Sequence, residues 1–544
     1  MQSNNQKKSP LPPEEIPTAH WADHAAEALL EKHPDKATLV CASGISPSGM
    51  VHIGNFREVI TVEFVVRALR DRGRNVRFIY SWDDYDAFRK VPANLPQKAK
   101  LESHLREPIS QLPDPFDDGC SSYAAHFEKI FEREIAELGV QPEYIRQNEP
   151  YRAGKYAAGI REALAGEKTI IEILNRYRTE PLASDWTCVS VFCRTCNKDT
   201  TQILRYEPPS TLHYRCEHCK ADAQVNFETE PGVKLLWRVD WPMRWAREGV
   251  DFEPGGKDHS STGGSYETGA EIIRALWKKE PPFYVQYDFV LAKGLGSKLS
   301  SSSGNLLTLG EALEIYEPQV IRWIFASRKP NLDFSIAFDL DVMKAYDDFD
   351  RCERFAFGRE QGEEKKVNYE RRIYEFASIP RRTRGEYGEM PAQFAFRHLC
   401  NILQIHQGDL AKTKQFFEKT ILTPEDDARF QARASRAWKW ITTFAPPEFK
   451  FTLRAAGDLP PKAKYPEAVR EVVSRLKSGK FDKAPEDQIA NELFEIMKRN
   501  QIDAKSFFQD IYTALIGKNN GPKLASFFLA IGPQHAAEIL EKAL

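Results

Sequence analysis

The chain has 544 residues, 42% of them hydrophobic and 28% charged, and 76 Lys and Arg against 78 Asp and Glu give a formal net charge of −2. A chain of this length is too long to fold around a single hydrophobic core, so roughly two to four domains are expected. The charge balance neither indicates nor excludes a nucleic-acid binder, because a near-neutral total can contain a basic face. No apolar run approaches the roughly 20 residues of a membrane span, and the polar start lacks the apolar core of a signal peptide.

Strand and helix patterns alternate in the first part of the chain. Residues 1–36 are predicted to form a tail and one helix. The segment "TLVCAS" at 38–43 is predicted to form the first strand, and residues 55–73 are predicted to form a helix that ends at Gly73. Further strands are predicted over residues 75–84 and near residues 145, 236 and 287. Strands that alternate with long helices imply βαβ units and a parallel sheet.

Two segments interrupt this alternation, a helical and loop-rich one at 85–180 and a cysteine-containing one at 185–226. The strand signal fades after about residue 335, and residues 346–544 carry helical patterns separated by proline-rich breaks. We therefore predict an α/β domain that carries insertions, followed by an all-α domain.

The segment "CASGISPSGMVHIGNFREV" leads from the first predicted strand into the first predicted helix of this alternation. Ligands bind outside the carboxyl ends of the strands in an open parallel sheet. Gly44, Gly49 and Gly54 let the backbone approach a ligand, and the helix start offers free N–H groups to phosphates. His52 can donate to a phosphate oxygen as charge builds in a transition state. An ordinary glycine-rich turn with a surface histidine stays open as the alternative.

The segment "GLGSKLSSSSGN" at 294–305 follows the last predicted strand of the α/β part. Such a loop of Gly and Ser can surround a triphosphate, with Lys298 as a point charge. A flexible linker is the alternative. A linker fits less well, because the loop follows an apolar strand and leads into the patterned segment 306–327.

The nine cysteines are unevenly spread, and four of them form the pairs "CRTC" and "CEHC". Residues 197–215 separate the pairs, which fits a zinc ribbon with Cys193, Cys196, Cys216 and Cys219 as ligands. Four thiolates leave no open position on Zn²⁺, so a structural role is expected. Cys188 is predicted to be spare, and His213 and His218 are less suitable ligands. A long chain with one metal site and scattered thiols favours a reducing cytoplasm over a disulfide framework.

The two loop motifs, in this order and at this separation, resemble the HIGH and KMSKS motifs of class I aminoacyl-tRNA synthetases. The closer resemblance is to the class I lysyl-tRNA synthetase family, through "SGISPSGMVHIGNFRE", "RVDWPMRW", "GKDHSSTGGSYETG" and "KLSSSSGN". It covers roughly residues 37–345. It implies a Rossmann-like catalytic domain in two halves, 37–184 and 231–345, a zinc-ribbon insertion at 185–230 and a helical anticodon-binding domain at 346–544.

The resemblance also implies a reaction and its partners. The carboxylate of lysine would attack the α-phosphate of ATP to give lysyl-adenylate and pyrophosphate, with Mg²⁺ as the partner of the triphosphate. The lysyl group would then pass to the terminal ribose of tRNA, with the zinc ribbon approaching the acceptor stem. The implied partners are ATP, lysine and tRNA, with no membrane. The oligomeric state stays open, and a monomer is among the states allowed.

Several site residues carry over from the family's motifs. His52 and Asn55 would contact the phosphates and adenosine of ATP, Lys298 would bind the leaving pyrophosphate, and Asp258 would accept the ribose hydroxyls as a buried carboxylate. The full predicted ATP site is Gly44, Ser48, Gly49, Gly54, Asp258, Lys298, Ser300 and Ser302. Asn55 occupies the position at which many class I enzymes have a second histidine. Ser301 occupies the position at which they have a second lysine, and Lys293 can supply the missing cation. Both departures resemble the lysine-type variant.

A lysine pocket needs an apolar or aromatic wall and an acidic or π-rich end. "WRVDWPMRW" and "SWDDYD" supply such groups at the predicted carboxyl ends of two strands. The predicted lysine-binding residues are Ser46, Asp83, Asp84, Asp240, Trp241 and His259. For each of them, a packed tryptophan or a capping aspartate stays open as the alternative.

The helical part contains a group of basic and aromatic residues, Arg433, Arg436, Trp438, Lys439 and Trp440. Such residues suit unpaired anticodon bases. A tryptophan core with a solvated basic face is the favoured alternative for this group.

Three other kinds of function are possible. The first is a class I synthetase for another amino acid: an enzyme for glutamate would need a basic pocket, and an enzyme for cysteine would need a zinc site with an open position. A synthetase-derived nucleic-acid-binding protein without activation would not need His52 and Lys298. A small-molecule adenylate-forming ligase would not need about 200 further helical residues.

Overall fold

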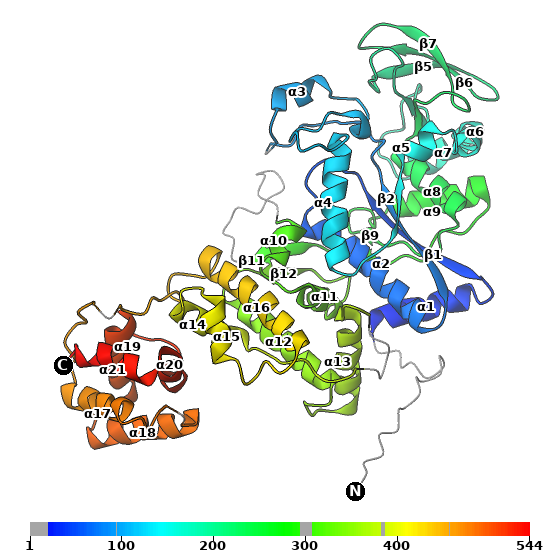
Figure 1. The fold of residues 1–544 in the computed structure, drawn as a ribbon. Helices are drawn as coiled ribbons and strands as arrows, with labels where there is room; N and C mark the ends of the chain where they lie inside the picture. Colours follow the sequence, from blue (N-terminus) through cyan, green and yellow to red (C-terminus); the bar gives the residue numbers. More distant parts are fainter. Residues whose placement is uncertain (1–19, 94, 294–306, 382–386, 456, 483) are drawn as a thin grey trace. The chain divides into compact units, whose positions relative to one another are not determined.

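The computed structural model describes residues 20–93, 95–293, 307–381, 387–455, 457–482 and 484–544 (Figure 1). The chain forms two compact units. Unit 1 contains Met1–Leu313, Pro318–Ile336 and Arg351–Glu389. Unit 2 contains Glu314–Glu317, Ala337–Asp350 and Met390–Leu544.

A parallel sheet organises unit 1, with β1 (Thr38–Ile45), β2 (Asn75–Trp82) and β3 (Glu143–Arg146) in the order β1-β2-β3. Thr38 lies opposite Asn75, so the two strands run in register from their first residues. Leu39 to Ala42 are buried, as expected for a strand of a parallel sheet that is covered on both faces.

The sheet continues on the other side of β1. Cys41 forms a parallel bridge with Phe252, and Phe252 forms one with Phe283. Just beyond these bridges, β9 (Gly255–Gly256) pairs in parallel with β10 (Gln286–Tyr287). The segments therefore lie in the order β3, β2, β1, Phe252, Phe283, and the order reverses at β1. This confirms the predicted Rossmann-like parallel sheet.

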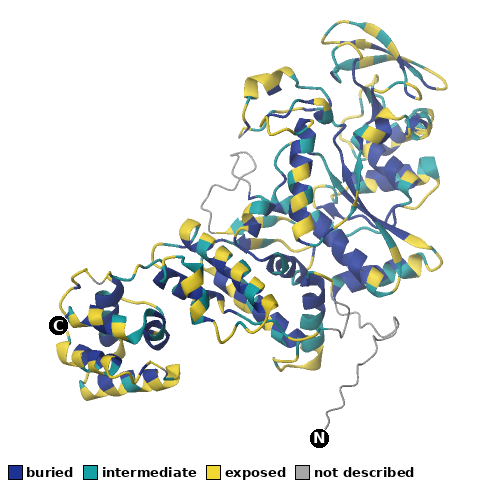
Figure 2. Cartoon of the chain, viewed as in Figure 1, coloured by how far each residue is buried: buried dark blue, intermediate teal, exposed yellow. Residues whose placement is uncertain are grey.

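The helix α2 (Ile53–Asp71) connects β1 to β2 and is largely buried (Figure 2). Its run "VITVEFVV" has apolar residues on nearly every side, which is typical of an interior helix. Two buried charges on α2, Glu63 and Arg67, form an ion pair of 2.6 Å one turn apart. The helix α4 (Tyr123–Glu137) precedes β3.

The strand predicted near residue 236 is largely wrong. Only β8 (Val233–Leu235) is extended, and α8 (Trp237–Glu248) follows it at once. Trp237, Trp241 and Trp245 recur every four residues, as do Asp240 and Arg244, which is the spacing of residues on one face of a helix. The loop-rich segment contains α3 (Lys98–Ser103), η2 (Ile109–Gln111), α5 (Asn148–Arg152), α6 (Ala157–Ala165) and α7 (Glu167–Asn175).

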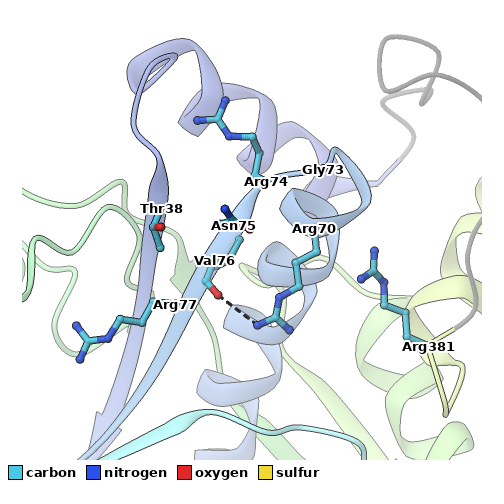
Figure 3. Close-up of a pocket in the computed structure, with 8 residues that line it drawn as sticks. All are labelled: Thr38, Arg70, Gly73, Arg74, Asn75, Val76, Arg77 and Arg381. Carbon is cyan, nitrogen blue, oxygen red and sulfur yellow. Dashed lines mark hydrogen bonds between the residues drawn. The ribbon is translucent and has the colours of Figure 1, made fainter.

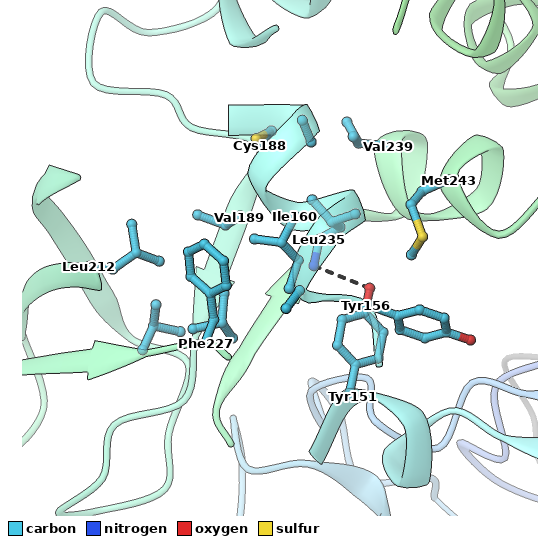
Figure 4. Close-up of a cluster of buried hydrophobic side chains, with 14 of the residues drawn as sticks. Tyr151, Tyr156, Ile160, Cys188, Val189, Leu212, Phe227, Leu235, Val239 and Met243 are labelled. Atoms are coloured by element: carbon cyan, nitrogen blue, oxygen red, sulfur yellow. Dashed lines mark hydrogen bonds between the residues drawn. The ribbon is translucent and has the colours of Figure 1, made fainter. Parts of the chain in front are cut away.

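The cysteine segment forms a small antiparallel subdomain. It consists of β5 (Thr201–Glu207), β6 (Thr211–Cys216) and β7 (Asp222–Asn226), with β4 (Val189–Val191) paired to β8 at its base. Figure 4 shows the apolar cluster beneath it, in which Leu212 and Phe227 lie near Val189 and Ile160. In the same cluster, the N–H of Leu235 donates to the hydroxyl of Tyr151 at 3.3 Å.

The rest of unit 1 and unit 2 is mainly helical. Unit 1 also has α1 (Trp21–Lys32), α9 (Ser265–Ile272), η3 (Ile273–Trp277), β11 (Val290–Lys293), β12 (Phe334–Ala337), α10 (Leu309–Leu313), α11 (Pro318–Ala326) and α13 (Glu364–Ala377), and α12 (Asp341–Ala356) contains the unit boundary. Unit 2 has α14 (Phe396–Ile405), α15 (Leu410–Phe416), α16 (Pro424–Thr443), α17 (Pro466–Lys477), α18 (Glu486–Arg499), α19 (Ala504–Ile516), α20 (Leu524–Ile531) and α21 (Pro533–Glu541). No described helix combines the length and apolarity that crossing a bilayer requires.

Two members of the basic and aromatic group of α16, Arg433 and Trp440, lie in the interior of unit 2. Arg433 is fully buried and pairs with Glu317 at 2.6 Å and with Asp350 at 2.8 Å. The indole N–H of Trp440, also buried, donates to the carbonyl of Phe338 at 2.8 Å. These two residues are therefore unavailable to RNA, and the favoured alternative, a packed core, holds for them.

Candidate active site

The candidate site lies at the carboxyl end of β1, where the order of the strands reverses. Open α/β sheets bind their ligands just outside the carboxyl ends of the strands, at such a reversal. The turn that follows β1 contains Ser48, which is exposed and whose carbonyl accepts from the hydroxyl of Tyr123 at 2.8 Å. Gly49 follows in this turn, and a Cβ there would meet Pro92 at an ordinary 3.4 Å.

His52 is the N-cap residue of α2, and the cap fixes its ring. Nδ1 accepts from the N–H of Gly54 at 3.0 Å, and the side-chain oxygen of Asn55 accepts from the N–H of His52 at 3.2 Å. Because Nδ1 accepts, the neutral ring carries its proton on Nε2. Burial lowers the pKa of His52, which favours this neutral form. The site thus holds a neutral Nε2–H donor at a helix N-terminus.

Two of the predicted glycines are required by neighbouring protein atoms. A Cβ on Gly54 would lie 2.8 Å from the ring of His52, so Gly54 makes room for the imidazole. A Cβ on Gly44 would lie 2.6 Å from the carbonyl oxygen of Ser81 on β2. Gly44 is therefore explained by the contact between strands, where we had expected close approach of a ligand.

Lys298, Ser300 and Ser302 lie outside the described residues, but both ends of their segment are described. The carbonyl of Leu307 accepts from the N–H of Ile53 at 2.9 Å, and Thr308 forms an antiparallel bridge with His52. On the other side, β11 ends at Lys293.

Arg57 of α2 attaches the chain before this segment to the same helix. Its guanidinium donates to the carbonyls of Asp288 at 2.7 Å and Phe289 at 3.0 Å. Burial lowers the pKa of Arg57 to about 10. The described segments before and after the second motif are thus both bonded to the first two turns of α2.

Asp258 follows β9 at the same edge of the sheet, but it is exposed. Its side chain is 70% accessible, and Oδ2 lies 3.7 Å from Nε2 of His259. The expectation of a buried carboxylate was therefore wrong. An exposed carboxylate next to a crevice can still accept hydroxyl groups from a ligand that covers it.

The three predicted pocket aspartates are buried and already bonded to protein groups. Asp83 accepts from Arg244 at 2.6 Å, Asp84 accepts from the N–H of Asn148 at 2.8 Å, and fully buried Asp240 accepts from the hydroxyl of Tyr151. Burial raises the pKa of Asp84 to about 7. Asp240 lies on α8 and not at the end of a strand, which corrects the predicted placement.

The aromatic wall is present and wider than predicted. Trp241 stacks on Trp237 with ring centroids 5.1 Å apart, and the ring of His259 lies 5.9 Å from Trp241 and 6.2 Å from Trp237. Trp237 was missed, although its spacing of four residues from Trp241 on a helix is visible in the sequence. Ser46 donates its hydroxyl to Asp86 at 2.6 Å.

A buried network of charges joins β2, β8 and α8. Arg244 donates to Asp83 and lies 3.4 Å from Asp240, while Lys234 pairs with Asp86. These three carboxylates face two cations, so this group has an excess of one negative charge when all are ionised. Arg244 and Lys234 could not be assigned from the sequence, because nothing in it brings them to the strand ends.

A second carboxyl lies between β1 and β10. Glu58 of α2 accepts from the N–H of Gly44 at 2.9 Å and from the hydroxyl of Tyr287 at 2.7 Å. Burial raises the pKa of Glu58 to about 8.

Another buried carboxyl lies behind the aromatic wall. Glu253 accepts from the indole N–H groups of Trp241 at 3.0 Å and Trp245 at 2.6 Å, and burial raises the pKa of Glu253 to about 7.

The ribbon cysteines come together as predicted. Their four Sγ atoms lie within 4.8 Å of one another, with Cys193 and Cys219 3.6 Å apart and Cys196 and Cys216 3.5 Å apart. Thiolates around a tetrahedral Zn²⁺ are separated by about 3.8 Å, as Zn–S bonds of about 2.3 Å require. The four residues therefore fit a structural zinc ion.

The local turns of the two Cys pairs match one another. The residue after each pair, Asn197 or Lys220, has a positive φ of 60° or 61°. Cys188 is buried in the apolar cluster beneath the ribbon, outside the thiol group, as predicted for a spare cysteine.

The structure also shows a mixed group of ligand-type side chains that the sequence analysis left out. Asp114, Asp118, Cys120 and His126 have their potential ligand atoms within 4.8 Å of one another. Nδ1 of His126 lies 2.8 Å from a carboxylate oxygen of Asp118. Among the described residues, the ribbon group is the one made of thiols alone.

An arginine-lined cavity of about 500 Å³ lies at the opposite, amino-terminal edge of β1 and β2 (Figure 3). Arg70 donates there to the carbonyl of Val76 at 3.3 Å. Arg77 pairs with Glu143 and Glu248, and Arg381 pairs with Asp71. This cavity therefore lies at the opposite edge of the sheet from the candidate active site.

The chain is similar to known proteins over most of its length. A relative from Borreliella burgdorferi named lysine–tRNA ligase is 43% identical over 531 residues, covering 96% of this chain and 99% of the relative. One of the same name from Pyrococcus furiosus is 41% identical, covering 94% and 97%. A solved glutamate tRNA ligase from Elizabethkingia meningosepticum is 12% identical with a TM-score of 0.43, covering 93% and 99%. Residues 19–380 match the family described as tRNA synthetases class I (K), and the chain belongs to that family.

Proposed function

We propose that the protein is a lysine–tRNA ligase that activates lysine with ATP and transfers it to tRNA(Lys). The observation that carries this proposal is the near full-length similarity to two relatives of that name, 43% and 41% identical. The capped histidine at the N-terminus of α2, next to the point where the strand order reverses, supports it.

The triphosphate of ATP would lie at the N-terminus of α2. There the free N–H groups and the helix dipole favour negative charge. Nε2–H of His52 would donate to a phosphate oxygen as charge develops during attack on the α-phosphorus, and Lys298 would bind the leaving pyrophosphate. Asp258 would accept the ribose hydroxyls. Mg²⁺, when bound to the triphosphate, would neutralise charge on its oxygens.

Lysine would lie between the end of β1 and the aromatic wall. Trp237, Trp241 and His259 offer apolar and π surface to its carbon chain, and a cation over an aromatic face is favourable. When Asp83, Asp86 and Asp240 are all ionised, the group around Arg244 and Lys234 carries an excess negative charge, which favours a cationic side chain over an acidic one. The reacting groups are held in position and little covalent help from the protein is needed.

We further propose that Cys193, Cys196, Cys216 and Cys219 hold one structural Zn²⁺, and that the helical residues 346–544 bind the anticodon part of tRNA. The thiol geometry supports the first assignment. The second rests on the all-helical character of these residues beyond the catalytic part.

The deciding experiment is amino-acid-dependent exchange of pyrophosphate into ATP across the twenty amino acids, with and without tRNA, followed by charging of tRNA(Lys). We expect exchange and charging with lysine. Exchange with another amino acid alone would refute the specificity. Absence of exchange under every condition would favour a binding protein without activation.

A further inference from the structure

Glu253 is a buried carboxyl that the reaction described above does not use. It is 8% exposed and follows Phe252, whose segment lies next to β1 in the sheet. The N–H of Glu253 donates to the carbonyl of Phe283 at 3.2 Å, so its backbone belongs to the sheet. The side chain therefore starts from the carboxyl-terminal edge of the sheet, which is the edge of the candidate active site.

Both carboxylate oxygens of Glu253 bind tryptophans of α8. Oε1 accepts from Nε1–H of Trp241 at 3.0 Å, and Oε2 accepts from Nε1–H of Trp245 at 2.6 Å. The centroids of these two rings lie 4.5 Å apart, and the ring planes are tilted by 52°. One side chain thus fixes the orientation of two indoles through hydrogen bonds that are charge-assisted when Glu253 is ionised.

The surroundings of these hydrogen bonds are otherwise apolar. Trp241 and Trp245 pack in one cluster with Val40 of β1 and Ile79 of β2. Burial of a carboxylate among apolar side chains costs free energy, and burial raises the pKa of Glu253 to about 7. A neutral glutamine would accept from only one indole, because its amide nitrogen is a donor. The acid therefore satisfies both rings and also places a negative charge behind them.

Charged groups of α8, β2 and α2 face Glu253. Arg244 favours its ionised form, whereas Asp83 and Glu58 disfavour it. Arg244 already pairs with Asp83 at 2.6 Å and lies 3.4 Å from Asp240, so it does not compensate Glu253 as well. The charge of Glu253 is therefore left to act on a cation at the aromatic wall.

Trp241 belongs both to this carboxylate and to the aromatic wall of Trp237, Trp241 and His259. Trp237 stacks on Trp241 with an interplanar angle of 18°. The guanidinium carbon of Arg244 lies 5.6 Å from the ring centroid of Trp237, so the wall already attracts one cation of the protein. A carboxylate that accepts from an indole N–H adds electron density to the ring and attracts a cation on the other side of it.

We propose that Glu253 is a positioning residue for the lysine site, which orients Trp241 and Trp245 and attracts the ammonium group of lysine across the aromatic wall. The inference rests on the proposed function, because it takes lysine as the ligand of the wall. It assigns part of the preference for a cationic amino acid to a residue that does not touch the ligand. A neutral side chain of equal length would gain nothing from this charge.

The test separates the charge of Glu253 from its hydrogen bonds. Trp245→Phe removes one indole donor and leaves the carboxylate bonded to Trp241. When Glu253→Gln is added to Trp245→Phe, the amide oxygen can accept from Trp241 and no indole N–H opposes the amide nitrogen. The two proteins then differ chiefly in charge. In lysine-dependent pyrophosphate exchange at pH 8.5, we expect the added Glu253→Gln to raise the KM for lysine about tenfold, with kcat and the KM for ATP retained.

Glu134→Gln is the matched control for the loss of a buried carboxyl. Glu134 of α4 is also buried, and burial raises its pKa to about 7, but it is not part of the aromatic wall. This variant should keep the KM for lysine of the wild type.

The pH profile gives a second measurement. In the wild type, the KM for lysine should fall as the pH rises through 7, because Glu253 loses its proton and gains its charge. The fall should be smaller in the single variant Glu253→Gln. Asp84 and Glu58 also have raised pKa values, but they are present in both proteins, so the difference between the two profiles reports Glu253.

Equal KM values for lysine with and without Glu253→Gln in the Trp245→Phe background would overturn the inference. So would an equal rise in the KM for ATP, because it would show a general structural role. The proposed function is read from the wild type. Absence of lysine-dependent exchange there would refute the ligase together with the inference, whereas exchange in the wild type with an unchanged KM in the variants would refute the inference alone.

Discussion

His52 is held in place by the first turn of its own helix. The ring accepts from Gly54, and Asn55 closes the reciprocal bond of the cap. Asparagine at the fourth position of the first motif therefore has a structural task, because its side-chain oxygen satisfies the N–H of His52.

His52→Asn tests the imidazole without removing the cap, because asparagine is itself a good N-cap residue. The variant loses the Nε2–H donor, so the rate of pyrophosphate exchange should fall by about 100-fold or more. The melting temperature and the Kd for tRNA should stay close to wild type. Normal exchange in a folded variant would show that His52 does not stabilise the transition state.

Glu58 gives a prediction about pH. Its folded pKa of about 8 lies above that of an unfolded glutamate, so between about pH 4.5 and 8 the folded protein holds a proton that the unfolded chain has released. This contribution favours folding at low pH and is lost as the pH rises through 8. Glu58→Gln resembles the protonated form and should reduce the fall in melting temperature between pH 6 and 9.

The matched control for this measurement is Glu248→Gln, which removes a partly exposed partner of Arg77. It should leave the shape of the pH profile unchanged. A Glu58→Gln profile parallel to wild type over the same range would mean that this carboxyl is ionised in the folded protein at neutral pH.

Among the elements, α8 decides the composition of the aromatic and charged part of the site. As a helix, it presents Trp237, Trp241 and Trp245 on one side and brings Arg244 within 2.6 Å of Asp83. A strand over the same residues would have sent neighbouring side chains to opposite faces. The helix therefore supplies a wall together with the cation that compensates the buried aspartates.

The ribbon gives a prediction for metal content. Cys193→Ser combined with Cys216→Ser should contain one zinc per chain less than wild type, because two of four ligands are lost. Comparison with wild type is needed, since the group around His126 also has ligand-type atoms. Cys188→Ser is the control and should keep the full zinc content. Equal zinc in the double variant and wild type would reject the ribbon site.

Across the whole chain, buried arginines connect segments that are far apart in sequence. In unit 1, Arg372 pairs with Asp23 at 2.7 Å, 349 residues away. In unit 2, Arg433 joins Glu317 and Asp350 to α16. These pairs hold α1 against α13 and the short segments of unit 2 against its helices.

Arg433→Ala should destabilise unit 2 by about 3–5 kcal/mol, because it leaves two carboxylates buried without their partner. Arg470→Ala removes an exposed pair with Glu467 and should cost at most about 1 kcal/mol. Urea unfolding followed by the fluorescence of unit 2 tryptophans checks both. A loss for Arg433→Ala no greater than for Arg470→Ala would contradict the importance of the buried network.

The parallel sheet, the helical second part, the grouping of the four ribbon cysteines and the glycine-rich turn at His52 could all be predicted from the sequence. Each of these is encoded by local patterns: apolar runs, helical periodicity, Cys spacing and a glycine-rich turn before a helix. The placement of His52 as a cap follows from the same few residues. Such features can be predicted from short stretches of sequence, because the residues that form them lie only a few positions apart.

Which charged side chains remain available to a ligand could not be predicted from the sequence, because it depends on how distant segments pack together. Asp83, Asp84 and Asp240 have the composition of a lysine pocket, yet each is bonded to a protein group from a distant segment. Asp258 turned out exposed, and Arg433 turned out buried. The burial and the ion pairs of these side chains depend on residues up to hundreds of positions apart. A local sequence pattern therefore cannot predict which charged side chain is buried or paired.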